Sequence, residues 1–238
     1  RMAWTVLLVS FGIFCLLAFA IPSSIYYFVQ HGTRSQTAKL DPTLGSFQLR
    51  PNRTAEIIAV TSSRDDIREG SMLVAGEDAT QGTLSFISER SGGSILGSAQ
   101  IYSGASVEIL RIREPVFERS TEPYLVRLAL QVGQARIFNN SGTNRELLVE
   151  LVTPHAIITM DNAGAYTVEV TEERTDFIAR TGEAIVNDNH GNAESVSELE
   201  RVLVNTEGLQ SASSLDEINL VVNGEFRPPD DNTGDNHW

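Results

Sequence analysis

Residues 124–138, YLVRLALQVGQARIF, show the clearest periodicity in the sequence. Apolar side chains occupy every second position in the first half of this stretch: Val126, Leu128, Leu130 and Val132. The positions between them hold Arg, Ala and Gln. A period of two predicts a half-buried strand, because successive side chains of a strand point to opposite faces of its sheet. Gly133 interrupts the pattern, and we predict that a second strand begins at Ala135.

Similar short runs lie on both sides of this stretch and are separated by Gly, Asn, Asp and Ser turn signals. They predict strands at residues 56–61, 72–75, 83–87, 99–102, 107–112, 147–152, 156–160, 165–171, 177–179, 184–186 and 201–204. Only residues 195–201 (SVSELER) suggest a short helix or a loop. The fold class is therefore mainly β, and a sandwich, a roll and a short β-solenoid all remain open.

The N-terminal residues form a separate apolar segment. Residues 2–29 carry no charge and have aromatic residues near both ends, and about 20 apolar residues suffice to cross about 30 Å of hydrocarbon. We predict a transmembrane anchor over residues 1–30. A cleaved signal peptide is the alternative, because residues 18–20 (AFA) have the small-x-small form of a cleavage site. The apolar run continues beyond that site, which favours a retained anchor.

The remaining chain is divided by composition. Residues 31–55 are polar, contain Pro42 and Pro51, and predict a stalk between membrane and domain. Residues 56–210 form the β domain, and residues 211–238 form a linker with the first strand of a further β module. We expect the whole chain after the anchor, including the β domain, to lie on the extracytoplasmic side, in a periplasm or outside the cell, as is usual for a signal anchor.

Composition excludes several classes of function. The formal net charge of −13 makes nucleic acid an unfavourable partner, because such binding depends on Lys and Arg at phosphates. The single cysteine, Cys15, lies inside the apolar segment. The soluble part therefore has no disulfide, no thiolate metal site and no cysteine nucleophile.

The side chains that could carry chemistry are scattered. The four histidines, His31, His155, His190 and His237, are too far apart in sequence to suggest a ligand pair. Adjacent carboxylates occur at residues 65–66, 172–173 and 230–231, and neighbours in a strand point to opposite faces. Residues 230–236 (DDNTGDN), between Asp230 and Asp235, have a composition that suits calcium but lack EF-hand spacing. We predict no catalytic, cofactor-binding or metal-binding residue, no cofactor and no enzyme activity.

The strand series resembles the extracytoplasmic β domain of bacterial FecR-type proteins. The segments that carry the resemblance are 67–74 (IREGSMLV), 97–102 (GSAQIY), 132–138 (VGQARIF), 153–156 (TPHA), 164–170 (GAYTVEV) and 181–186 (TGEAIV). The likeness extends from about residue 67 to residue 208. The sequence departs from the family pattern at Ala163-Gly164, where a Gly-Thr pair is usual. FecR regulators also carry a cytoplasmic sigma-factor-binding segment before the anchor, where this sequence shows only Arg1.

A second likeness lies near the C-terminus. Residues 219–226 (NLVVNGEF), followed by Trp238, resemble the first strand of carbohydrate-binding jelly-roll modules. This resemblance implies a glycan as a further partner.

These observations favour one function and leave two alternatives. We expect a non-enzymatic accessory or scaffold subunit of a larger membrane complex, such as an electron-transfer complex. Its partners would be the lipid bilayer and other protein subunits. The alternatives are a FecR-type envelope signalling protein and a surface carbohydrate-binding protein.

Overall fold

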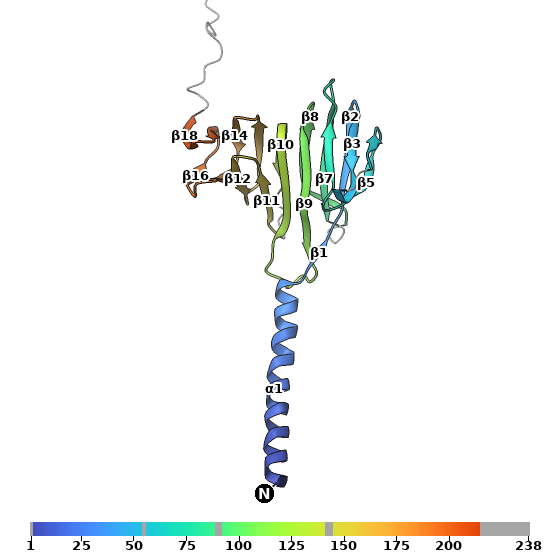
Figure 1. The fold of residues 1–238 in the computed structure, drawn as a ribbon, viewed down its shortest axis with the longest axis vertical. Helices are drawn as coiled ribbons and strands as arrows, with labels where there is room; N and C mark the ends of the chain where they lie inside the picture. Colours follow the sequence, from blue (N-terminus) through green and yellow to red (C-terminus); the bar gives the residue numbers. More distant parts are fainter. Residues whose placement is uncertain (1, 54–55, 89–91, 141–144, 215–238) are drawn as a thin grey trace, which may run out of the picture.

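The computed structural model describes residues 2–53, 56–88, 92–140 and 145–214. One long helix carries a β domain at its C-terminal end (Figure 1). The fold class predicted from the sequence, mainly β with a single N-terminal helix, is confirmed.

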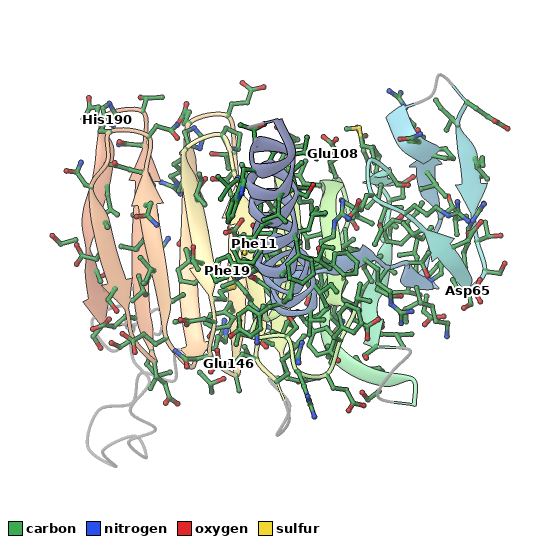
Figure 2. All side chains as sticks on the ribbon, turned by 90° about the horizontal axis from the view of Figure 1, so that it is seen from below. Phe11, Phe19, Asp65, Glu108, Glu146 and His190 are labelled. Carbon is green, nitrogen blue, oxygen red and sulfur yellow. The ribbon has the colours of Figure 1, made fainter. Side chains whose placement is uncertain are left out.

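Helix α1 (Met2–His31) extends away from the domain (Figure 1). At 1.5 Å per residue its 30 residues span about 45 Å, more than the hydrocarbon thickness of a bilayer. None of the apolar stretch Trp4–His31 is buried against the protein. Phe11 and Phe19, which are 62% and 79% exposed, lie on this helix (Figure 2). The helix is long and apolar enough to cross a membrane, or to serve as a signal sequence.

The strands form two sheets, which we call sheet A and sheet B. Sheet A contains, in spatial order, β4 (Ile58–Val60), β3 (Phe47–Arg50), β6 (Met72–Ala75), β9 (Ser106–Pro115), the first half of β10 (Tyr124–Asn139), β11 (Leu147–Val152), β12 (Ala156–Met160), β15 (Ala184–Asp188) and β16 (Ala193–Val196). Strand β1 (Thr33–Ser35) pairs with the C-terminal part of β9. The short 3-10 helix η1 (Pro51–Arg53) follows β3.

Sheet B contains, in spatial order, β5 (Arg64–Ile67), β2 (Ala38–Leu44), β7 (Gln81–Ser88), β8 (Ser94–Tyr102), the second half of β10, β13 (Gly164–Val170), β14 (Arg174–Thr181), β17 (Glu200–Asn205) and β18 (Gly208–Ser214). Within the described residues, β10 with β11 is the one parallel pairing of the two sheets. The inward side chains of both sheets meet in one core, which includes Leu128, Leu151, Val168 and Phe177. The strand pairing closes into a barrel, so of the architectures left open by the sequence the structure is nearest to a roll, with the two sheets on opposite sides of one core.

Strand β10 joins the two layers. Its residues Leu125 to Val132 pair with β9 in sheet A, and Gly133 to Asn139 pair with β13 in sheet B. Gly133 lies at the change of sheet with a φ of +94°. The sequence predicted two strands separated at this glycine, whereas the structure has one strand that bends there and continues in the facing sheet.

The predicted alternation holds over most of β10. Val126, Leu128 and Leu130 are buried in the core as expected. Val132 is 43% exposed, because a register irregularity between Leu130 and Val132 ends the regular pleat one residue before the bend.

The prediction of a polar stalk over residues 31–55 is wrong. This segment forms β1, β2 and β3, and its apolar side chains Ala38, Leu40, Phe47 and Leu49 are buried in the core. The domain therefore begins directly after the helix. The sequence pattern missed this, because β2 and β3 contribute only two core residues each among polar neighbours and β1 contributes none.

Other predictions had mixed outcomes. The strands expected at 72–75, 147–152 and 156–160 have the predicted bounds in β6, β11 and β12. The short helix suggested for 195–201 is wrong, because the segment contains the end of β16, a turn and the start of β17. The further β module predicted within 211–238, with its strand at 219–226, lies outside the described residues apart from the end of β18.

Candidate functional site: the junction between helix and domain

The C-terminal end of α1 contacts the loop of residues 116–123, which connects β9 to β10 (Figure 1). The rings of Phe28 and Phe117 meet edge to face, with centroids 5.6 Å apart. The hydroxyl of Ser120 donates a hydrogen bond to the main-chain carbonyl of Gln30. A carbonyl near the end of a helix lacks an intrahelical partner, so this bond caps the helix with a side chain of the domain.

The last residues of the helix make further contacts with the same region. His31 Nδ1 lies 2.6 Å from Glu122 Oε1. The amide of Gly32 donates to the carbonyl of Phe28, and the amide of Val116 donates to the carbonyl of Gly32, each at 2.8 Å. A Cβ at Gly32 would lie 2.6 Å from the Phe28 carbonyl oxygen, so the close turn requires glycine.

The loop itself is held from its other side. Arg145 donates hydrogen bonds to the main-chain carbonyls of Glu118 and Glu122, at 2.7 and 3.2 Å. We call the contact set of Phe28, Gln30, His31, Gly32, Phe117, Ser120 and Glu122 the junction. It holds the helix to the domain through a ring contact, main-chain hydrogen bonds and a His–Glu pair.

A buried polar network lies next to the junction, where β1 leaves the helix. Glu114 is 1% exposed, and its carboxylate accepts hydrogen bonds from Arg34 Nη2 and Ser88 Oγ, both at 2.8 Å, and from the Gln36 side-chain amide. The hydroxyls of Ser88 and Tyr124 are 3.1 Å apart. Burying a carboxylate costs free energy unless it is paired and hydrogen-bonded, and here β1, β7 and the link between β1 and β2 supply the partners. The network therefore fixes β1 to the domain.

The histidines noted in the sequence are spread over the molecule. His31 belongs to the junction. His155 is buried, and its Nδ1 lies 3.1 Å from the hydroxyl of Thr175. His190 lies in the turn after β15, at the periphery of the domain (Figure 2). His237 lies outside the described residues.

The adjacent carboxylates are not brought together. Residues 65–66 lie in β5 and residues 172–173 in the turn between β13 and β14. Residues 230–231, and with them the calcium-like segment from Asp230 to Asp235, lie outside the described residues. Within 2–53, 56–88, 92–140 and 145–214 there is no group of three or more His, Cys, Asp or Glu side chains placed to hold a metal ion.

One carboxylate outside the junction, that of Asp188, connects the two sheets. Asp188, at the end of β15, accepts hydrogen bonds from the side chain and amide of Asn192, and from the amides of His190 and Leu209. These donors stabilise the charged form of the carboxyl and lower the pKa of Asp188 to about 2, and the Asn192 side chain has the largest effect. The bond to Leu209 links β15 of sheet A to β18 of sheet B.

This contact makes stability depend on pH. An unfolded Asp has a pKa near 3.9, so the stabilisation by Asp188 is present above about pH 4 and is lost as pH falls through about 2. In urea titrations we expect Asp188→Asn to unfold at a lower midpoint than wild type at pH 7, and the difference to vanish near pH 2. Asp65→Asn, at an exposed position, is the control. A midpoint difference that persists at pH 2 would contradict the assignment.

Comparisons with known proteins identify no family. No family model and no curated protein matches the chain. Two solved structures are similar, both crystal structures of a proposed anti-sigma factor from Parabacteroides distasonis ATCC 8503. They have TM-scores of 0.43 and 0.40 and sequence identities of 14% and 17%. The match spans 60% of this chain and 59% of each of those chains. The FecR-type resemblance stays a prediction.

The junction residues were not singled out by the sequence. Phe117 is one aromatic residue in the polar run VFERSTEP, and Ser120 and Glu122 have no distinguishing spacing. Arg34 and Glu114 are 80 residues apart. The one available signal was His31-Gly32 directly after the apolar segment, where a glycine is typical of a helix end.

Proposed function

We propose that this protein is a non-enzymatic envelope signalling protein of FecR type, anchored in the membrane by α1 with its β domain on the extracytoplasmic side. Its β domain binds a protein partner. When binding moves the β domain or assembles several copies of it, the junction transmits that change to the membrane helix. The junction is the observation that carries this proposal. A helix attached by a flexible stalk would turn independently of the domain. This helix is instead held to the loop of residues 116–123 by a ring contact, a hydrogen bond and a His–Glu pair.

The accessory-subunit prediction shares the first step, which is binding of a protein by the β domain. A scaffold needs only an anchor, and a fixed angle between helix and domain adds nothing to that role. The proposal rests on the junction and not on the solved structures, whose TM-scores are below 0.5. The carbohydrate-binding prediction depends on residues 219–226, which the structure does not describe.

The test uncouples the helix from the domain while leaving both folded. The triple variant Phe117→Ala, Ser120→Ala, Glu122→Gln removes the ring contact, the cap and the pair with His31. In cells that produce the triple variant, we expect the transcript profile to match that of a strain from which the gene for this protein is deleted. Glu118→Gln is the control in the same loop, because Glu118 contributes its main-chain carbonyl to Arg145.

Two further readings make the result decisive. Immunoblots of membrane fractions must show the triple variant at the wild-type level, and its melting temperature must stay above the growth temperature. A wild-type transcript profile in the triple variant would refute signalling through the junction. If that variant also retained its partner in mild detergent, the scaffold function would be favoured instead.

A further inference from the structure

A cleft with a volume of about 460 Å³ opens beside β5, the strand at one edge of sheet B (Figure 1). Its walls come from β1, β3, η1, β5 and residues 68–71, which connect β5 to β6. Leu49 and Pro51 contribute apolar surface, and the other lining side chains are polar or charged. The volume is within the range of small-molecule sites, about 300–1,000 Å³, and the lining suits a polar ligand.

A tight turn places two of the polar residues at the cleft. The amide of Ser71 donates a hydrogen bond to the carbonyl of Arg68 at 3.1 Å, and Gly70, in the third position, has a φ of +79°. This geometry is that of a type II turn, whose first and last residues lie close together. Between them, the carboxylate of Glu69 pairs with Arg113 at 3.0 Å and accepts a hydrogen bond from a main-chain amide of β9. The turn is thus fixed to β9 and holds Arg68 and Ser71 side by side.

The hydroxyl of Ser71 has no partner in the part of the chain that the structure describes. Ser71 is only 3% exposed, and the hydrogen bonds that it forms there are made by its main-chain atoms. The hydroxyl borders the cleft and is not closed off from solvent, so a ligand can reach it. Polar groups in a protein interior are nearly always hydrogen-bonded, so this hydroxyl points to a partner bound in the cleft.

The charges around the cleft leave one guanidinium unmatched. Arg64 Nη2 lies 3.0 Å from Asp66 Oδ2, and Glu69 is paired with Arg113. Arg64 has the largest effect in lowering the pKa of Asp66, and Arg68 adds only a small one. Arg68 is exposed and forms no ion pair with any described residue. A guanidinium beside a hydroxyl donor is suited to a carboxylate, and the single unmatched charge suits an acid with one negative charge.

Two further side chains supply neutral hydrogen-bonding groups. Ser35 of β1 and Asn52 of η1 line the same cleft, and both are exposed. A hydroxyl and a carboxamide each donate and accept hydrogen bonds, which matches the hydroxyl groups of a ligand. The cleft therefore combines a place for one carboxylate with places for several hydroxyls.

We infer that this region, the Arg68 cleft (Ser35, Asn52, Arg68 and Ser71), binds a small hydroxylated carboxylic acid of the size of a monosaccharide. Arg68 and Ser71 donate hydrogen bonds to the carboxylate, and Ser35 and Asn52 bond to the hydroxyls. This site goes beyond the proposed function and does not depend on it, because it uses neither the junction nor a protein partner.

The experiment is isothermal titration calorimetry on the full-length protein in a neutral detergent. The probes are glucuronate, glucose, which lacks the carboxylate, and acetate, which lacks the hydroxyls. We expect glucuronate to bind with a Kd of about 1 mM or lower, as is ordinary for a ligand of about a dozen heavy atoms. Glucose and acetate should each bind at least about tenfold more weakly, because each loses one of the two sets of hydrogen bonds.

Variants locate the site. We expect Arg68→Gln to weaken glucuronate binding about tenfold or more, and Ser71→Ala about threefold to tenfold. Ser35→Phe places a ring in the cleft without changing its charge and should abolish binding. Arg180→Gln is the matched control, because Arg180 is an exposed arginine on β14, on the other side of the domain from β5 (Figure 1). Circular dichroism must show unchanged melting for each variant.

Four outcomes would overturn the inference. Absence of glucuronate binding, or equal binding by Arg68→Gln and wild type, would refute the site. Glucose binding as tight as that of glucuronate would show that no charge is recognised. Acetate binding as tight as that of glucuronate would show that the hydroxyls are not recognised. None of these results concerns the junction, so the signalling proposal stands or falls by its own transcript assay.

Discussion

Replacement of Leu128 by aspartate is expected to unfold the β domain. Leu128 is 1% exposed, and it pairs with Ile109 of β9 and Leu151 of β11 inside the core. The change removes a buried aliphatic side chain, which costs about 2–5 kcal/mol, and adds an unpaired charge, which costs several kcal/mol more. Domains of this size have a free energy of unfolding of about 5–15 kcal/mol, so one substitution removes most of it.

The measurement is urea denaturation of the detergent-solubilised protein, followed by circular dichroism. Leu44→Asp is the control, because it makes the same chemical change at a residue that is 55% exposed. Its free energy of unfolding should stay within about 0.5 kcal/mol of wild type. A cooperative transition at the wild-type midpoint in Leu128→Asp would show that the inward face of β10 has been assigned wrongly.

Gly133→Ala is also expected to destabilise the domain, although it adds a single methyl group. Gly133 has a φ of +94°, and a Cβ there would lie 2.4 Å from Ala105 Cα and 2.7 Å from its Cβ. The positive φ costs an L-residue about 1–2 kcal/mol, and the contact is with backbone, which cannot rotate away. We expect a total loss of roughly 2–4 kcal/mol, because the bend between the two sheets must open.

Gly104→Ala separates the two causes of this loss. Gly104 has a similar φ of +70°, but nothing lies within 4 Å of the position of its Cβ. This control should therefore lose only the backbone term of about 1 kcal/mol. Equal denaturation midpoints for the two variants would mean that the approach of Gly133 to Ala105 has no energetic consequence.

Much of the fold was predictable where a strand is long and one face is buried. The alternation in β10 and β13 follows directly from burial of one face, and Tyr166, Val168 and Val170 lie in the core as their spacing indicates. Strands β2 and β3 were missed, because two apolar residues in a polar run do not establish a period, and β1 has no apolar residue at all. The burial of β2 and β3 depends on pairing with β7 and β6, which are distant in sequence.

The candidate sites were less predictable than the strands. The junction joins residues such as His31 and Glu122, which are 91 positions apart. The buried network next to the junction likewise joins Glu114 to Arg34 and Ser88, which are 80 and 26 positions away.

The sequence by itself determined the apolar N-terminal helix, the mainly β class and the inward face of the central strand. These properties are local, because they depend on the polarity and spacing of neighbouring residues. The tertiary structure decided that β10 crosses between sheets, that the expected stalk belongs to the core, and that the helix is held at a junction. Each of these depends on contacts between distant segments, whose pairing is set by the packing of the whole core and not by any one stretch of sequence.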